Sequence, residues 1–246
     1  MRKNALWGAL TIVLFAGAIV MGQESQTPTL QQQLQQKAAD ASKRYPAEML
    51  KIMADAVESV RETGIEKSAK QVGDSAIDAE LSGWDGKKVR LSEQWSKGPL
   101  VLMWYRGGWC PYCNLQLQAM QKELKTLEGA GAQLIVLTPE LPEKAKETAA
   151  ANQLSFVALH DKNSALARKY GLLFDLPETI APLYRDRLKL AEVNGSDEMA
   201  LPLSATYVID ADGKIRYAYL NADYKARAEP AEVVAEVKKI AADQAK

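Results

Sequence analysis

Alternating apolar and polar stretches predict an α/β fold over most of the chain. Three continuous apolar runs have the length of a strand and are typical of buried strands: residues 99–105, 132–138 and 155–159. Two dipeptides favour β-hairpins: Asp85-Gly86 and Asp212-Gly213. The second joins two further apolar runs, so the carboxyl-terminal half is expected to close the sheet with a hairpin.

Helical spacing of apolar residues follows several of these runs. The helices are expected after residue 110, over 143–153, over 164–171 and from Pro230 onwards. Residues 172–203 show a weaker pattern to which no element is assigned. This order of elements predicts a central sheet flanked by helices.

The region before the sheet divides into three parts. Residues 1–22 join a basic start to an apolar run with small residues near Gly22, which predicts a cleaved export signal or, alternatively, an uncleaved anchor. Residues 23–66 are expected to be a Gln-rich linker that turns into a loose helix, then an amphipathic helix from Pro46. Residues 67–246 form the main domain. The protein is therefore expected outside the cytoplasm, in the periplasm or another extracytoplasmic space, without stable membrane contact if the signal is cleaved.

Composition excludes few functions but argues against some partners. The chain has 246 residues, is 47% hydrophobic and 25% charged, and has a formal net charge of zero. This is an ordinary globular balance, and neither sign of charge suggests nucleic acid as a partner.

The candidate chemistry lies in the segment YRGGWCPYCN, which holds both cysteines of the chain. Pro111 favours the first position of a helix, so Cys110 is expected at the cap, facing free N–H groups and the positive end of the helix dipole. Both features favour a thiolate and predict a lowered pKa for Cys110. Cys113, nearly one turn further on, is expected to lie deeper. The sequence thus assigns Cys110 as the attacking thiolate and Cys113 as the resolving thiol.

Other interpretations of the cysteine pair remain open. A structural disulfide over so short a loop would constrain little of the unfolded chain. A zinc site would need about four ligands, whereas the chain offers two cysteines and His160. His160 could instead act as a base for Cys110. No metal or other cofactor is therefore assigned.

Three neighbours of the cysteines are further candidates. Arg106, four residues before Cys110, could stabilise a thiolate or a peroxide oxygen, or it could be a surface arginine that pairs elsewhere. Trp109 and Tyr112 could form an apolar docking surface beside the sulfur or serve in packing.

The segment GPLVLMWYRGGWCPYCNLQLQAMQ resembles the active-site region of peroxiredoxin-like proteins of the alkyl hydroperoxide reductase/thiol-specific antioxidant family. Residues 72–93 are similar to the opening hairpin region of that family, and residues 204–230 to its closing hairpin. The resemblance covers about residues 45–240 and implies a thioredoxin-like fold with an N-terminal helical extension. It also implies reduction of hydroperoxides through a sulfenic acid at Cys110 and a disulfide to Cys113, recycled by a thioredoxin-like or glutathione-type reductant.

The chain departs from the family pattern at informative positions. Typical members have Pro-x-x-x-Thr-x-x-Cys, and the proline and threonine positions are Met103 and Gly107 here. Trp-Cys-Pro-Tyr-Cys instead matches thioredoxins and glutaredoxins, whose cis-proline position falls near Ser204, two residues after Pro202. Two alternatives to a peroxidase therefore remain: a thiol-disulfide oxidoreductase acting on protein disulfides, and a non-enzymatic redox sensor.

Overall fold

A computed structural model describes residues 28–244 of the chain. The expected signal or anchor segment, residues 1–22, lies outside these described residues. Within residues 28–244, no helix is long and apolar enough to cross a membrane.

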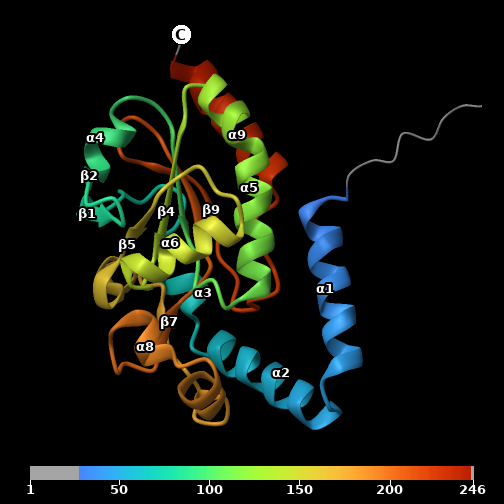
Figure 1. Ribbon diagram of the computed structural model, residues 1–246. Coiled ribbons are helices and arrows are strands. Elements are labelled where there is room, and N and C mark those ends of the chain that lie inside the picture. Colours follow the sequence, from blue (N-terminus) through green and yellow to red (C-terminus); the bar gives the residue numbers. More distant parts are fainter. Residues whose placement is uncertain (1–27, 245–246) are drawn as a thin grey trace, which may run out of the picture.

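The centre of the molecule is a seven-stranded sheet with the order β2-β1-β5-β4-β3-β8-β9 (Figure 1). Its strands are β1 (Glu80–Gly83), β2 (Lys88–Arg90), β3 (Leu100–Trp104), β4 (Gln133–Thr138), β5 (Ala158–His160), β8 (Thr206–Ile209) and β9 (Ile215–Tyr219). β3 pairs parallel with β4 and antiparallel with β8. All three apolar runs and both hairpins of the sequence analysis therefore contribute strands to one sheet.

The side chains of β3 alternate between the two faces of the sheet, so each face has an apolar core. Helices cover both of these faces. Val101 and Met103 face α5 (Pro111–Gly129), α6 (Pro142–Ala151) and α9 (Pro230–Gln244). Leu100 and Leu102 face α3 (Ile65–Ser68), α4 (Leu91–Trp95) and α7 (Ala165–Lys169), which follows the short turn η1 (Lys162–Ser164). The expected α/β architecture, a central sheet flanked by helices, is confirmed.

The N-terminal helices extend this architecture. α1 (Leu30–Arg44) is well formed, whereas the sequence predicted a linker and a loose helix. Leu30 and Leu34 are only 2% and 3% exposed, and they pack on the core beside α5. Its first N–H groups, of Leu30 and Gln31, donate to the carboxylate of Glu229 at 3.1 and 3.0 Å. The expected amphipathic helix after Pro46 is α2 (Ala47–Glu62).

Residues 172–203 contain four short elements that the sequence did not predict. They are β6 (Leu173–Asp175), the π-helical turn η2 (Leu183–Arg187), α8 (Leu190–Asn194) and β7 (Ala200–Pro202). Each spans only three to five residues, too few to establish a period. Their apolar side chains form a third cluster with Ala56 of α2. This cluster sets α2 and η2 opposite each other in front of the cysteine loop.

Candidate active site

The loop that carries the cysteines is held in a tight conformation between β3 and α5. Cys110 is the N-cap of α5, as the sequence predicts, and its N–H donates to the carbonyl of Gly107 at 3.0 Å. A Cβ on Gly108 would lie 2.0 Å from Thr148 Oγ1, and one on Gly107 would lie 2.2 Å from Trp109 Nε1. The two glycines therefore allow the loop to pass closely between its neighbours.

A buried carboxylate anchors this loop through a hydrogen bond to its backbone. Glu140, just beyond β4, accepts a hydrogen bond from the Gly108 N–H at 2.8 Å and another from the Thr148 hydroxyl at 3.3 Å. Burial raises the pKa of Glu140, although these hydrogen bonds partly offset the effect. No motif in the sequence pointed to this residue.

Each cysteine sulfur is paired with an arginine. Both thiols are free, and Cys110 and Cys113 are 1% and 0% exposed. The Nη2 atom of Arg106 donates to Cys110 Sγ at 3.3 Å, and Nη2 of Arg227 donates to Cys113 Sγ at 3.4 Å. Arg227 lies 114 residues from Cys113 in the chain, so no local motif in the sequence indicated it. The hydroxyl of Ser204 is 4.0 Å from Cys113 Sγ, so this position does face the cysteines.

The pKa values of the two thiols shift in opposite directions. Burial alone would raise the pKa of Cys113, but the hydrogen bond from Cys110 and the charges of Arg227 and Arg106 hold that pKa well below its ordinary value. Burial, the hydrogen bond to Cys113 and the charge there raise the pKa of Cys110 well above its ordinary value. These opposite directions favour the thiolate at Cys113 and the thiol at Cys110.

This distribution differs from the lowered pKa that the sequence predicted for Cys110. Cys110 does occupy the N-cap, but its sulfur accepts no hydrogen bond from the N–H groups of the first turn. The cap position therefore gives the Cys110 sulfur no hydrogen bond, and burial is the largest influence on its pKa. Arg106 and Arg227 act to lower the pKa of Cys110, but burial and the neighbouring Cys113 outweigh them.

Arg106 is fixed by its surroundings and is not a surface arginine. It is 3% exposed, and its Nη1 donates to the hydroxyl of Tyr184 at 3.3 Å. Its guanidinium also lies over the rings of Tyr224 and Trp109, at 4.7 and 5.3 Å from their centroids. Burial alone would lower the pKa of Arg106, but Tyr184 and the cysteines raise it, so the group stays charged. Its position is thus set before any substrate binds.

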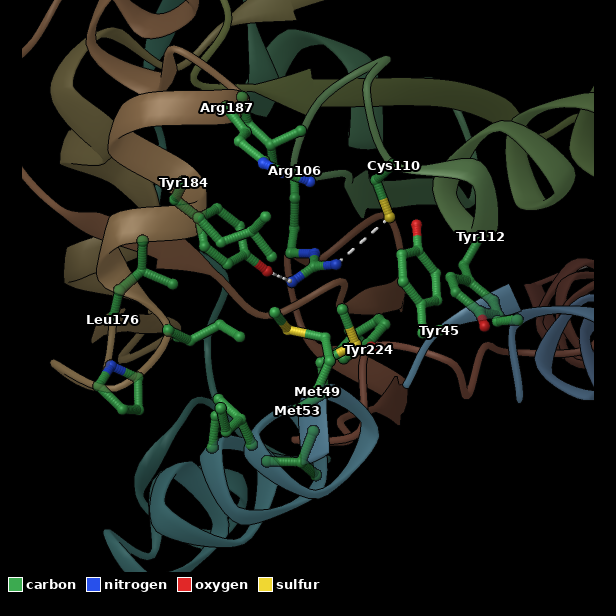
Figure 2. Close-up of a pocket in the computed structure, with 18 of the residues that line it drawn as sticks. Tyr45, Met49, Met53, Arg106, Cys110, Tyr112, Leu176, Tyr184, Arg187 and Tyr224 are labelled. Carbon is green, nitrogen blue, oxygen red and sulfur yellow. Dashed lines mark hydrogen bonds between the residues drawn. The ribbon is translucent and has the colours of Figure 1, made fainter. Parts of the chain in front are cut away.

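A pocket of about 950 Å³ opens in front of Cys110. Figure 2 shows Arg106 between Tyr184 and Cys110, with Met49 and Met53 on the facing helix. The pocket is walled by α1, α2, the cysteine loop and η2, and Cys110, Arg106, Trp109 and Tyr112 all line it. Cys113 does not, which leaves Cys110 as the sulfur that a small molecule would meet.

Of the other residues that the sequence singled out, Trp109 and Tyr112 lie at the pocket and His160 does not. Trp109 and Tyr112 each pack edge-on against another pocket residue, Tyr184 and Tyr224 respectively. They therefore serve in packing and also form part of the pocket wall. His160 ends β5, two strands from β3, and does not line the pocket. The structure does not bring it to Cys110.

The arrangement suits an electrophile with a polarised oxygen. Such a group in the pocket would meet Cys110 Sγ and the Arg106 guanidinium together. Cys113 lies directly behind, in hydrogen-bond contact with Cys110. A group bound to Cys110 Sγ could then be displaced by Cys113 from the buried side of the pocket wall.

Comparison with known proteins gives consistent matches. The model of the AhpC/TSA family matches residues 72–218. "Peroxiredoxin Q, chloroplastic" of Gentiana triflora is 28% identical over 141 residues, which are 57% of this chain and 55% of that protein. "Peroxiredoxin Bcp" of Escherichia coli (strain K12) is 24% identical over 153 residues, which are 61% of this chain and 85% of that protein.

Solved structures agree in fold. "Peroxidoxin BcpB" from Mycobacterium tuberculosis superposes with a TM-score of 0.54 at 21% identity, over 69% of this chain and 97% of that one. This likeness supports the expected thioredoxin-like fold. The chain spans 55% of the length of the first curated relative. Helices α1 and α2 and Arg227 all lie outside the residues that the family model matches.

Proposed function

Because the chain belongs to the AhpC/TSA family, we propose that it is a thiol-dependent peroxidase that reduces hydroperoxides. The observation that carries the proposal is the contact between Arg106 Nη2 and Cys110 Sγ at 3.3 Å, at the pocket wall and with a second thiol behind. This arrangement brings together a nucleophile (Cys110), a cationic donor for oxygen (Arg106) and a resolving thiol (Cys113). The sulfur-oxygen chemistry needs no cofactor.

The first step breaks the O–O bond. The proton on Cys110 moves to Cys113, because the two sulfurs are hydrogen-bonded. The Cys110 thiolate then attacks the terminal oxygen of ROOH, giving Cys110–SOH and RO⁻. Arg106 faces the oxygens as negative charge develops on the leaving group. RO⁻ takes up the proton from Cys113, so that an alcohol leaves and Cys113 becomes the thiolate.

The second step forms the disulfide. Cys113 thiolate attacks the sulfur of Cys110–SOH, the S–O bond breaks, and hydroxide leaves and is protonated to water. Arg227 holds this nucleophile charged: its Nη2 lies 3.4 Å from the sulfur, and it is 2% exposed. In total, two electrons pass from the two sulfurs to the peroxide.

Burial of Cys110 favours a small substrate over a protein disulfide. A sulfur that is 1% exposed at the wall of a pocket is poorly placed to attack a bond on the surface of a folded protein. The same geometry bears on recycling. The pocket of about 950 Å³ offers a small, glutathione-type thiol a route to Cys110, whereas a thioredoxin-like reductant would require α2 and η2 to separate.

Rapid mixing of the reduced protein with hydrogen peroxide and cumene hydroperoxide tests the proposal. We expect one disulfide for each peroxide consumed, a single oxidation without a disulfide in Cys113→Ser, and no reaction in Cys110→Ser. Oxidation of Cys110 no faster than that of free cysteine would contradict a peroxidase. Reduction of insulin disulfides at a higher rate than peroxides would favour the oxidoreductase instead.

A further inference from the structure

We propose that Tyr45, at the joint between α1 and α2, is a further catalytic residue, whose hydroxyl donates a hydrogen bond to the leaving oxygen of a hydroperoxide at Cys110. This inference rests on the proposed peroxidase function, and it concerns a residue outside the family-matched residues 72–218. Three observations carry it: the position of Tyr45 in the pocket, the direction of its hydroxyl and the composition of the cysteine loop.

A hydroperoxide can reach the reactive sulfur from one side only. Cys110 is 1% exposed and lines the pocket, whereas Cys113 does not line it. On the buried side, the Cys110 thiol has Cys113 as its hydrogen-bond partner. Because the sulfur attacks in line with the O–O bond, the oxygen that leaves as RO⁻ points away from the sulfur and into the pocket. A second donor for that oxygen has to come from the outer wall of the pocket.

Tyr45 stands on that wall. It lines the pocket and is 43% exposed, so a molecule that enters can contact it. Figure 2 shows its hydroxyl pointing toward the Cys110 sulfur, which lies between this hydroxyl and the Arg106 guanidinium in that view. Burial raises the pKa of Tyr112, and the nearby Cys110, Asp223 and Tyr45 raise it further, so Tyr45 and Cys110 lie near the same ring. Within residues 28–244, the Tyr45 hydroxyl has no hydrogen-bond partner.

The local sequence fixes the backbone of Tyr45. Tyr45 is the C-cap of α1 and has an extended conformation, with φ −97° and ψ 143°. Pro46 follows it, and a proline restricts the preceding residue to extended conformations. The two helices are themselves docked, α1 through Leu30 and Leu34 and α2 through Val60, which are all buried. The joint therefore presents the tyrosine to the pocket before any substrate binds.

The cysteine loop lacks a comparable donor. Between Arg106 and Cys113, Tyr112 is the only residue with a hydroxyl, and Gly107 stands where typical family members have threonine. Figure 2 shows the hydroxyl of Tyr112 pointing away from the Cys110 sulfur. A hydroxyl that reaches a peroxide at this sulfur therefore comes from outside the loop.

The other hydroxyls of the pocket are placed differently. The lining residues that carry one are Tyr45, Tyr112, Thr179, Tyr184 and Tyr224. The Tyr184 hydroxyl accepts a hydrogen bond from Arg106, which separates it from the sulfur in Figure 2. Thr179 belongs to the same wall as Tyr184, and the ring of Tyr224 lies against the Arg106 guanidinium. Tyr45 is the residue that brings a hydroxyl to the sulfur from the wall formed by α1 and α2.

The hydrogen bond changes no proton count in the reaction. As the Cys110 thiolate attacks, the electron pair of the O–O bond passes to the outer oxygen, which leaves as RO⁻. Tyr45 keeps its proton and donates a hydrogen bond to this oxygen, while Arg106 supplies positive charge. RO⁻ then takes up the proton from Cys113, as described above. Because this donor acts on charge that develops during the reaction, its loss should slow the reaction more than it weakens binding.

Tyr45→Phe keeps the ring and removes only the donor. Rapid mixing with hydrogen peroxide should give a rate constant on the order of tenfold below that of the wild type, as for one hydrogen bond made only in the transition state. The matched control is Tyr217→Phe, which removes a hydroxyl that contacts Glu232 at 3.4 Å, outside the pocket lining. It should react at the wild-type rate. Cooperative melting shows that both variants are folded.

The leaving group separates a donor from a structural role. Peracetic acid releases acetate, a far weaker base than hydroxide, so its reaction depends less on a donor. The loss in Tyr45→Phe should therefore be smaller with peracetic acid than with hydrogen peroxide, and alkylation of Cys110 by iodoacetamide should not change. An equal loss with all three reagents would show a structural role and refute the proposal.

The wild-type rate distinguishes this proposal from the one on which it rests. Oxidation of wild-type Cys110 no faster than that of free cysteine would refute the peroxidase function itself. Fast oxidation of the wild type, with Tyr45→Phe equally fast, would refute the catalytic role of Tyr45 alone.

Discussion

Replacing Arg227 should raise the pKa at which the cysteine pair loses its first proton. Nη2 of Arg227 lies 3.4 Å from Cys113 Sγ, and the guanidinium is fixed by donating to the backbone carbonyls of Tyr224 and Ala226. A hydrogen bond to a charged group contributes roughly 1.5–3 kcal/mol. At about 1.36 kcal/mol for each pKa unit, Arg227→Met should raise this pKa by on the order of one to two units.

The assay is the thiolate absorbance in the ultraviolet, titrated against pH in a Cys110→Ser background. Serine at position 110 can still donate a hydrogen bond to Cys113, so the titration reports a single sulfur in a similar environment. Arg227→Lys should move the midpoint less than Arg227→Met, because it keeps the charge but loses the fork of donors. In the chain with both cysteines, Arg227→Met should prolong the life of the sulfenic acid without slowing its formation equally.

Lys225→Met is the matched control, since Lys225 lies two residues away and pairs with Asp223 at 3.6 Å. It should leave the midpoint within error of the parent. A midpoint in Arg227→Met that equals the parent, in a variant whose melting curve is cooperative, would refute the assignment of Arg227 as the group that charges Cys113.

Three further predictions concern the loop and the thiol pair. Arg106→Ala should slow peroxide reduction on the order of 10²-fold and exchange with a small disulfide much less, measured by rapid mixing with each reagent. Gly108→Ala should lower the melting temperature because its Cβ would lie 2.0 Å from Thr148 Oγ1, and Thr148→Ala in the same chain should restore part of the loss. The lowered pKa of Cys113 should make the reduced protein more stable than Cys113→Ser as pH rises toward the ordinary thiol pKa of about 9.0, because the unfolded thiol still holds its proton there. The raised pKa of Cys110 should reverse this trend at higher pH, and denaturant melts at several pH values would show a flat difference if neither shift exists.

The sequence predicted the parts of the fold whose pattern is local. β3 and β4 are continuous apolar runs, and α5 begins at a proline, so their positions follow from neighbouring residues alone. α1 was underestimated because its stability comes from two leucines and from the carboxylate of Glu229, 199 residues from Leu30. No local pattern carries that contact.

The residues of the site also divide into those that a local motif predicts and those that come from distant parts of the chain. Cys110, Cys113 and Arg106 lie within one short segment, where spacing is informative. Arg227 and Glu140 reach the same loop from distant positions in the chain. The position of the negative charge was also beyond the sequence, because it depends on how two arginines are shared between two buried sulfurs.

The closeness of the two sulfurs bears on resistance to oxidative damage. A sulfenic acid that meets a second peroxide is converted to a sulfinic acid, which most enzymes cannot reverse. Here the resolving thiol is completely buried, has a lowered pKa and has Cys110 as its hydrogen-bond partner. Disulfide closure therefore joins two neighbouring sulfurs of one segment and needs no reagent to diffuse in. The competing inactivation is left little time, even when peroxide is abundant.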